Sequence, residues 1–457
     1  MIQLDKKDFS VGSVTRHILS LAVPMTVAQF VQIIYNIVDR IYIGNLPGAD
    51  SMALTGLGLT FPIVAVVAAF TNLFGMGGAP LCSIARGQGN DNKAERIMGT
   101  TFSMLAVTSV VIMILCYVFM HNILCAFGAS DASYPFAAKY LKIYLIGTPL
   151  IMIGTGMNAF INSQGFGTIG MITVLSGAVI NIILDTVFIF GFKMGIEGAA
   201  LATVISQLIS CAWVICFLCG KKTILKLRLE NLKIDFSLLG KIVGLGTASF
   251  IMSASTGLTQ IVYNRTLKTN GGDIYVGIMA ALNSVRDFVI LPGLGLTQAA
   301  QPVIGYNLGA GKYDRIKQAI VFTSVVSAVY MLVTWLFLLI FPREIISIFG
   351  SNKEFLDLGA KALHIFFFGF VAMAFQAAGQ SVFVGMGMSK HAIFFSLLRK
   401  VIIVIPLTFI LPNFVSPAVN GVLLAEPVSN VVGGLACYIT MIVTVNKIIK
   451  GENVPRT

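Results

Sequence analysis

The chain has 457 residues, of which 56% are hydrophobic and 11% are charged, and its mean hydropathy is +0.88. Charged residues make up about a quarter of an ordinary soluble domain, so this composition excludes a soluble globular protein. The net charge of +12 does not indicate a nucleic-acid partner, because the basic residues lie in short segments between apolar runs and form no basic tail. The composition therefore predicts one membrane-embedded domain.

Apolar stretches recur from end to end, each of about 20 residues or more and so long enough to cross about 30 Å of hydrocarbon as a helix. The first stretch follows a charged segment with no clean cleavage site, so we expect it to be retained as a membrane helix. A tight turn at residues 193–195 separates the fifth stretch from the sixth. In chain order, twelve transmembrane helices are predicted at residues 17–43, 52–78, 95–119, 136–161, 168–192, 195–219, 237–267, 274–304, 315–341, 358–385, 391–412 and 417–446.

Lysines and arginines gather on one side of the predicted membrane. They fill the segments before the first helix and after each even-numbered helix, above all residues 219–241. The loops of the opposite side have only Lys193, Lys268, Arg343 and Lys353. Because basic loops are retained in the cytoplasm, both termini are predicted to be cytoplasmic, which agrees with an even number of crossings.

The second half of the chain repeats the first. Residues 32–36 (QIIYN) recur as residues 260–264 (QIVYN), and residues 198–202 (GAALA) recur as residues 421–425 (GVLLA), within matches spaced 220 to 228 residues apart. Six helices per repeat give both halves the same orientation, related by an axis along the membrane normal. The predicted fold is an all-α polytopic membrane protein with twelve transmembrane helices in two pseudo-twofold-related six-helix bundles. The bundles are assigned to residues 1–220 and 237–457, joined by a cytoplasmic linker at 221–236.

Polar side chains inside the predicted membrane helices are the main functional candidates, because an ionised group at mid-membrane costs roughly 2.5–3.5 kcal/mol unless it faces a cavity or a partner. In the first helix they recur three and four residues apart, which places them on one helical face. The amino-terminal set consists of Gln32, Tyr35, Asn36 and Asp39 in the first helix, Asn181 and Asp185 in the fifth, and Thr203 in the sixth.

Two ions suit this set. Carboxylate, amide and hydroxyl oxygens are hard ligands that suit Na⁺, and two desolvated acids close together would equally bind a proton, because both cannot remain charged. The structural alternative is that Asp39 caps a helix or pairs with Arg40, while Asp185 joins a hydrogen-bond network. As a metal site for Na⁺, the ligands would be Asp39, Asn181, Asp185 and Thr203.

The repeat favours the functional interpretation. At the spacings of the matching motifs, Asp39 corresponds to Leu267 in the second half. Asn181 and Asp185 likewise correspond to apolar residues of the eleventh predicted helix. Packing alone would tolerate apolar residues in both halves, so acids present in one half alone indicate a role in ion binding.

The second half has polar membrane residues of its own. Glu426, which stands where the first half has the sixth-helix threonine, is a candidate for a second proton site or a substrate contact. Ion pairs that hold helices together are the favoured role of Arg286, Asp287, Arg399 and Lys400. The residues proposed to line a substrate cavity are Gln32, Tyr35, Gln260, Asn264, Arg286, Asp287, Gln376 and Glu426.

Motifs of enzymes are missing from the sequence. It contains no GxxxxGK[ST], HExxH or GxSxG pattern, and the GxGxxG at residues 165–170 lies between two apolar stretches, where it predicts a turn. Seven cysteines, mostly inside apolar stretches, imply no disulfide framework, and the CxxC at Cys216 and Cys219 lacks the partners of a metal site. We therefore expect no enzyme activity and no cofactor, with an ion gradient as the source of energy.

Five segments, at residues 34–57, 87–96, 181–203, 291–315 and 421–429, together resemble the multidrug and toxic compound extrusion (MATE) transporters, in particular their bacterial MepA-like branch. The likeness spans essentially the whole chain. It implies a V-shaped pair of bundles in the bacterial cytoplasmic (inner) membrane that alternates between inward-open and outward-open states. It also implies export of lipophilic, often cationic small-molecule drugs in exchange for H⁺ or Na⁺.

The family's cation-site positions match Asp39, Asn181, Asp185 and Thr203 of this sequence. One departure concerns the seventh and tenth helices, where another branch of the family carries acids. This sequence has amides there, at Gln260, Asn264, Gln376 and Gln380, which argues against a cation site in the second half.

The leading hypothesis is that Asp39 and Asp185, oriented by Asn36 and Asn181, bind the driving cation in exchange with the drug. A monomer is expected. Two alternatives remain at this point. One is a lipid-linked oligosaccharide or lipid flippase, whose cationic cavity would come from Arg286, Arg399 and Lys400. The other is a membrane enzyme or a non-transporting scaffold.

Overall fold

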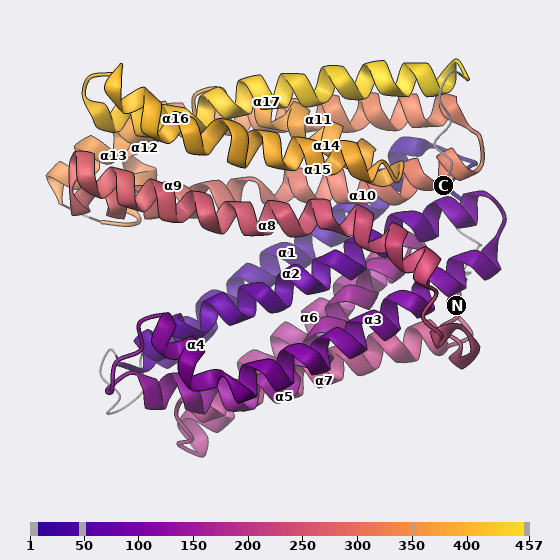
Figure 1. The fold of residues 1–457 in the computed structure, drawn as a ribbon, viewed down its shortest axis with the longest axis horizontal. Helices are drawn as coiled ribbons and strands as arrows, with labels where there is room; N and C mark the ends of the chain where they lie inside the picture. Colours follow the sequence, from indigo (N-terminus) through magenta and orange to yellow (C-terminus); the bar gives the residue numbers. More distant parts are fainter. Residues whose placement is uncertain (1–7, 45–51, 351, 452–457) are drawn as a thin grey trace. The chain divides into compact units, whose positions relative to one another are not determined.

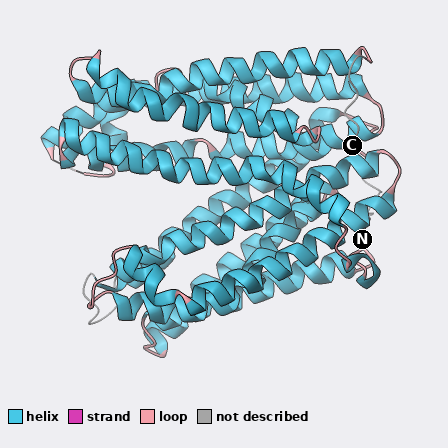
Figure 2. Cartoon of the chain, viewed as in Figure 1, coloured by secondary structure: helices cyan, strands magenta, loops and turns pink. Residues whose placement is uncertain are grey.

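The computed structural model describes residues 8–44, 52–350 and 352–451. Within these ranges the chain consists of helices joined by short turns, with no strand (Figure 1 and Figure 2). An α-helix pairs its backbone groups within the segment, which is what a segment in hydrocarbon requires. The predicted all-α polytopic class is confirmed.

The first half contains seven α-helices and one π-helical turn among the described residues. They are α1 (Val14–Gly44), α2 (Met52–Gly87), α3 (Asp91–Val118), α4 (Met120–Ala126), α5 (Tyr134–Ser163), α6 (Gly167–Asp185), the π-helix η1 (Thr186–Gly191) and α7 (Ile196–Cys219).

The second half follows a short 3-10 helix, η2 (Leu229–Leu232). Its elements are α8 (Phe236–Gly271), α9 (Asp273–Val289), α10 (Leu291–Gly309), α11 (Tyr313–Ile340), α12 (Pro342–Ser347), α13 (Lys353–Phe366), α14 (Ala372–Gly385), α15 (Ser389–Leu397), the π-helix η3 (Leu398–Val404), α16 (Ile405–Ile410), the 3-10 helix η4 (Leu411–Asn413) and α17 (Ala418–Ile449).

Ten helical segments of the described chain are long and apolar enough to cross a membrane. Helices α9 and α10 meet at an angle of 43°, and the two together are long and apolar enough to count as one further span. The prediction of one continuous helix over 358–385 is wrong, because α13 and α14 are separate helices of 14 residues each. Between them Gly369 adopts a φ of +72°, a left-handed conformation that ends an α-helix.

Two predicted turns have the expected form. Gly165 lies between α5 and α6 with a φ of +93°, and its amide donates to the Asn162 carbonyl at 2.9 Å, so the GxGxxG pattern is a helix-to-helix turn. Between η1 and α7, Lys193 and Gly195 have φ values of 56° and 61°. Both turns reverse the chain within a few residues and let neighbouring helices pack side by side.

The chain divides into two compact units. The first contains Val23–Gly246, and the second contains Ser10–Ala22 together with the described residues from Thr247 onward. Helices α1 and α8 therefore each contribute residues to both units. Each unit has its own core of buried apolar side chains.

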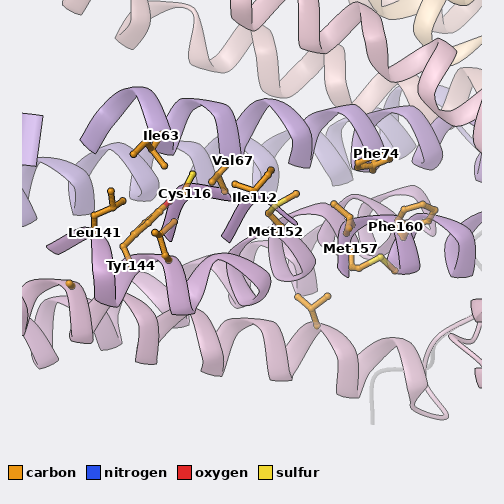
Figure 3. Packing of buried hydrophobic residues seen from close by; sticks show 14 of the residues in the cluster. Ile63, Val67, Phe74, Ile112, Cys116, Leu141, Tyr144, Met152, Met157 and Phe160 are labelled. Atoms are coloured by element: carbon orange, nitrogen blue, oxygen red, sulfur yellow. The ribbon is translucent and has the colours of Figure 1, made fainter. Parts of the chain in front are cut away.

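The core of the first unit lies where α2, α3 and α5 pack together. Small residues permit this approach: a Cβ added at Gly75 of α2 would lie 3.0 Å from the Cα of Gly156 in α5. Figure 3 shows the side chains that fill the layer, which are Ile63, Val67 and Phe74 of α2, Ile112 and Cys116 of α3, and Leu141, Tyr144, Met152, Met157 and Phe160 of α5.

Residues 221–235, which follow α7, are bound to the first unit by polar contacts. The carboxylate of Glu95 in α3 accepts hydrogen bonds from the Lys226 amide at 2.9 Å and the Asn231 side chain at 3.3 Å, and it pairs with Arg228 at 3.2 Å. The side-chain oxygen of Gln164 accepts three more hydrogen bonds from residues 223–225. This segment is therefore an ordered part of the first unit.

Candidate functional site

A cavity of about 330 Å³ lies inside the first unit, between helices α1, α2, α5, α6 and α7. All the residues that line it belong to Val23–Gly246, so one unit forms it. Its size falls in the range of roughly 300–1,000 Å³ that small-molecule pockets occupy. Its polar lining comes from all five helices, and its apolar lining mainly from α2 and α6.

The polar face of α1 forms one wall of this cavity. Gln32, Tyr35, Asn36 and Asp39 all line it, because side chains three and four residues apart share a helical face. Oδ1 of Asp39 is buried and has no hydrogen-bond partner. The guanidinium of the adjacent Arg40 lies 4.8 Å from the centre of the Phe61 ring, in a cation–π contact.

The end of α6 places the second acid beside the first. Asp185 is fully buried, and neither of its carboxylate oxygens has a hydrogen-bond partner. It is not among the residues that line the cavity, and it lies within electrostatic range of Asp39 and of Tyr35. A buried carboxylate without donors is costly, so these oxygens require a cation or a proton.

Asn181 and Thr203 complete the group. Asn181 is 1% exposed, its side-chain amide faces the Thr203 hydroxyl at 3.5 Å, and its own Oδ1 has no partner. The hydroxyl of Thr203 donates to the Ala199 carbonyl at 3.0 Å, so its oxygen acts as an acceptor toward Asn181. Asn181 and Asp185 thus lie one helical turn apart in α6, with the Thr203 hydroxyl 3.5 Å from the Asn181 amide and with Asp39 within electrostatic range of Asp185.

Sequence reasoning missed two tyrosines of α5. Tyr140 and Tyr144 line the cavity with their rings stacked at a centroid distance of 5.9 Å, and the Tyr140 hydroxyl faces that of Thr203. Their spacing of four residues in an apolar helix was a usable signal, but aromatic residues at that spacing are more often part of a core. A second missed group, away from the acids, is Thr71, Asn72, Thr155, Asn158, Ser206, Gln207 and Ser210.

The candidates of the second unit do not line this cavity. Gln260 donates to Asn264 at 3.0 Å and accepts from Asn283 at 2.8 Å, and buried Gln376 faces the Phe395 carbonyl at 3.5 Å. These amides form contacts within and between helices of the second unit.

The charged candidates of the second unit form two sets of ion pairs, and Arg286 of the first set also lies within electrostatic range of the Glu426 set. Arg286 pairs with Asp287 at 3.0 Å, its neighbour on the same helix, so that pair does not join two helices. Lys400 and Arg399 both pair with Glu426, at 2.8 and 3.3 Å, and thereby connect η3 to α17.

Known proteins resemble this chain over most of its length. The sequence pattern of the MatE family matches residues 24–187 and 241–410. Two relatives named "Multidrug export protein MepA" are 29% identical in Staphylococcus haemolyticus, over 78% of this chain and 78% of the relative, and 27% identical in Staphylococcus saprophyticus, over 94% and 95%.

Solved structures share the fold. The chain matches an outward-facing multidrug resistance MATE family transporter with a TM-score of 0.90 and 20% identity, over 98% of this chain and 99% of the other. A MATE structure in a bent conformation matches with a TM-score of 0.92 at 20% identity, over 98% and 99%. Because the family pattern covers both halves and the relatives carry the MepA name, the resemblance seen in the sequence is confirmed. The chain belongs to the MATE family of membrane transporters.

Proposed function

We propose that this protein is a secondary-active multidrug efflux antiporter, which exports lipophilic and cationic organic compounds in exchange for H⁺ or Na⁺. The observation that carries the proposal is the cavity of the first unit, where the half-buried carboxylate of Asp39, with one buried oxygen that has no hydrogen-bond partner, lies among tyrosines and within electrostatic range of Asp185. The names of the Staphylococcus relatives support drug export as the direction and class of transport.

The proposed coupling site consists of Asp39 and Asp185, with Asn36, Asn181 and Thr203 as neighbouring ligands. A cation or proton that binds at the two acids removes one of their two negative charges. A cationic drug gains from that charge only while the acids are uncompensated, so each ligand disfavours the other. Mutual exclusion of this kind couples their movements, because a ligand shifts an equilibrium by its differential affinity for the two states.

The substrate class follows from the cavity lining. Tyr35, Tyr140 and Tyr144 present ring faces and hydroxyls, and Phe61 adds an apolar face. Ring faces attract cations and stack on planar aromatic compounds, and the acids contribute negative charge. Flat organic cations have both a planar aromatic face and a positive charge, so they are the substrates that this lining favours.

The placement in the membrane is also a proposal. Lysines and arginines concentrate in residues 221–233 and around the turns that precede α3 and α11, so we place these segments and both termini in the cytoplasm of a bacterial cell. Two six-helix bundles joined by residues 221–236 then cross the inner membrane, and one chain suffices to build the cavity, which favours a monomer.

A flippase is less well supported. Two of the three cations that would line its cavity, Arg399 and Lys400, are engaged by Glu426 and are buried. They are therefore unavailable for a lipid phosphate.

Efflux from proteoliposomes tests the proposal. A fluorescent organic cation is loaded, and its export is followed while the pH gradient and the sodium gradient are collapsed one at a time. Export that stops with one gradient and persists with the other identifies the coupling ion. Export that survives the loss of both gradients, or no export in any condition, refutes ion-coupled drug transport.

A further inference from the structure

The second unit contains a buried ion cluster that the proposed coupling site does not use. Lys400 and Arg399 lie 2.8 and 3.3 Å from the same carboxylate oxygen of Glu426, and the Tyr263 hydroxyl lies 3.4 Å from the other. The exposed fractions of Arg399, Lys400 and Glu426 are 7%, 4% and 2%. Ionised groups held this deep in a membrane protein are costly, so a cluster of three calls for a function.

Matching contacts fix how the two units correspond. In the first unit the side chain of Asn158 donates to the Gly170 carbonyl at 3.2 Å. In the second, Gln380 donates to the Ala392 carbonyl at 2.9 Å, and both partners lie 222 residues further along the chain. The helix pair α5 and α6 therefore corresponds to α14 and α15 at a spacing of 222.

Helices α7 and α17 correspond at a spacing of 223, which is the spacing of the GAALA and GVLLA segments. Three cavity-lining side chains of α7 have counterparts in α17 at this spacing, and the pairs are Thr203 with Glu426, Ser206 with Ser429, and Gln207 with Asn430. All three counterparts contact Arg399. Its Nη1 lies near Glu426 and donates to Asn430 at 2.9 Å, and its carbonyl accepts from Ser429 at 2.8 Å.

The first unit has small residues where these cations stand. Lys400 corresponds to Ala178 at a spacing of 222 and to Gly177 at a spacing of 223, and both of these line the cavity. Arg399 and Lys400 lie in the π-helix η3, and both of these consecutive residues reach the same acid.

We propose that Arg399 and Lys400 are tethered cations, which occupy in the second unit the place that the first unit keeps open for a cation from solution. Their positive charges compensate the Glu426 carboxylate, and they cannot exchange with cations from solution because they belong to the chain. Glu426 is therefore a cryptic cation site, which means a site that is closed to other cations while Arg399 and Lys400 are present. The second unit then contributes no ion to the transport cycle. The comparison with the first unit rests on the proposed coupling site, but the cluster itself does not.

The test exposes the cryptic site in the full-length protein. The double variant R399M/K400A removes both charges and opens space beside Glu426, whereas R399M/K400M removes the same charges and keeps the space filled. Thermal unfolding of each purified protein is measured with increasing methylammonium chloride, and with choline chloride as a bulky control. We expect methylammonium to raise the unfolding midpoint of R399M/K400A in a saturable manner and to leave R399M/K400M and the wild type unchanged.

Each result decides the proposal. A folded R399M/K400A protein whose midpoint does not respond to methylammonium overturns it, as does an equal response in the wild type. Recovery of R399M/K400A only when methylammonium is present during extraction supports it. Failure to recover that variant with or without methylammonium overturns it, because no cation then replaces the tethered pair. Since the assay does not depend on transport, a failure of the proposed coupling site appears separately, in the efflux measurements.

Discussion

Replacement of Asp185 by asparagine tests the coupling site most directly. The side chain is fully buried and its two oxygens have no donors, so the substitution breaks no hydrogen bond and preserves the shape. What it removes is one negative charge beside the cation. At an effective dielectric constant of about 20, a charge about 4 Å from a cation contributes about 4 kcal/mol.

That energy corresponds to roughly a thousandfold in the equilibrium constant for cation binding, since about 1.4 kcal/mol is tenfold. The amide oxygen of the asparagine still acts as a ligand, so we expect the measured loss to lie between about a hundredfold and a thousandfold. The unfolding midpoint without cation should stay equal to that of the wild type or rise, because an uncompensated buried charge has been removed.

The assay is thermal unfolding in a titration with Na⁺ at fixed pH and with acid at fixed salt, followed by ion-driven efflux of the same proteins. Asp39→Asn is measured in parallel, and Asp131→Asn, which alters an exposed acid between α4 and α5, is the matched control. If Asp185→Asn keeps the cation affinity and the ion-driven efflux of the control, the reasoning is refuted.

Three further changes probe other parts of the structure. Tyr140→Phe should leave the fold intact and weaken binding of aromatic cations a few-fold, measured as the drug concentration for half-maximal efflux, because it removes the hydroxyl at the cavity wall and keeps the ring. Gly246→Ala places a Cβ 1.7 Å from a backbone carbonyl oxygen of α2, so it should lower the free energy of unfolding by roughly 1–3 kcal/mol, measured in a chemical unfolding titration. Gly240→Ala is the control, because the space around its Cβ is open and the free energy of unfolding should not fall. Glu95→Gln should weaken the attachment of residues 221–235 and speed their cleavage in limited proteolysis, because it removes the charge that holds them. The control is Glu230→Gln, which alters an exposed acid of the same segment. Equal rates of cleavage in the two variants would contradict the anchoring role of Glu95.

Most of the helical segments could be predicted because hydrocarbon acts on local composition. A long apolar run must become a helix in a membrane, whatever its neighbours are. Two predicted helices are broken, 274–304 between α9 and α10 and 358–385 between α13 and α14. The second break depends on packing, because Phe367 and Phe370 are buried on either side of the left-handed Gly369, and the apolar residues around it give no sign of a break.

Part of the candidate site could likewise be predicted from the sequence, and part could not. Helical spacing alone placed Gln32, Tyr35, Asn36 and Asp39 on one face of α1, and the repeat showed that the second half lacks the acids. That α6 places Asp185 beside this face, without a donor for either oxygen, depends on how α1, α6 and α7 pack. No spacing within a single helix contains that information.

The sequence by itself determined the membrane class, the order of the helices and the duplication, because each follows from composition or from repeated local pattern, and its resemblance to known transporters indicated the family. Tertiary structure alone decided which polar residues share a space. It enclosed the cavity of the first unit with α5 tyrosines that looked like core, and it brought Arg399 and Lys400 onto Glu426 in the second. The physical reason is that contacts between helices are set by the packing of whole faces, which only the folded chain brings together.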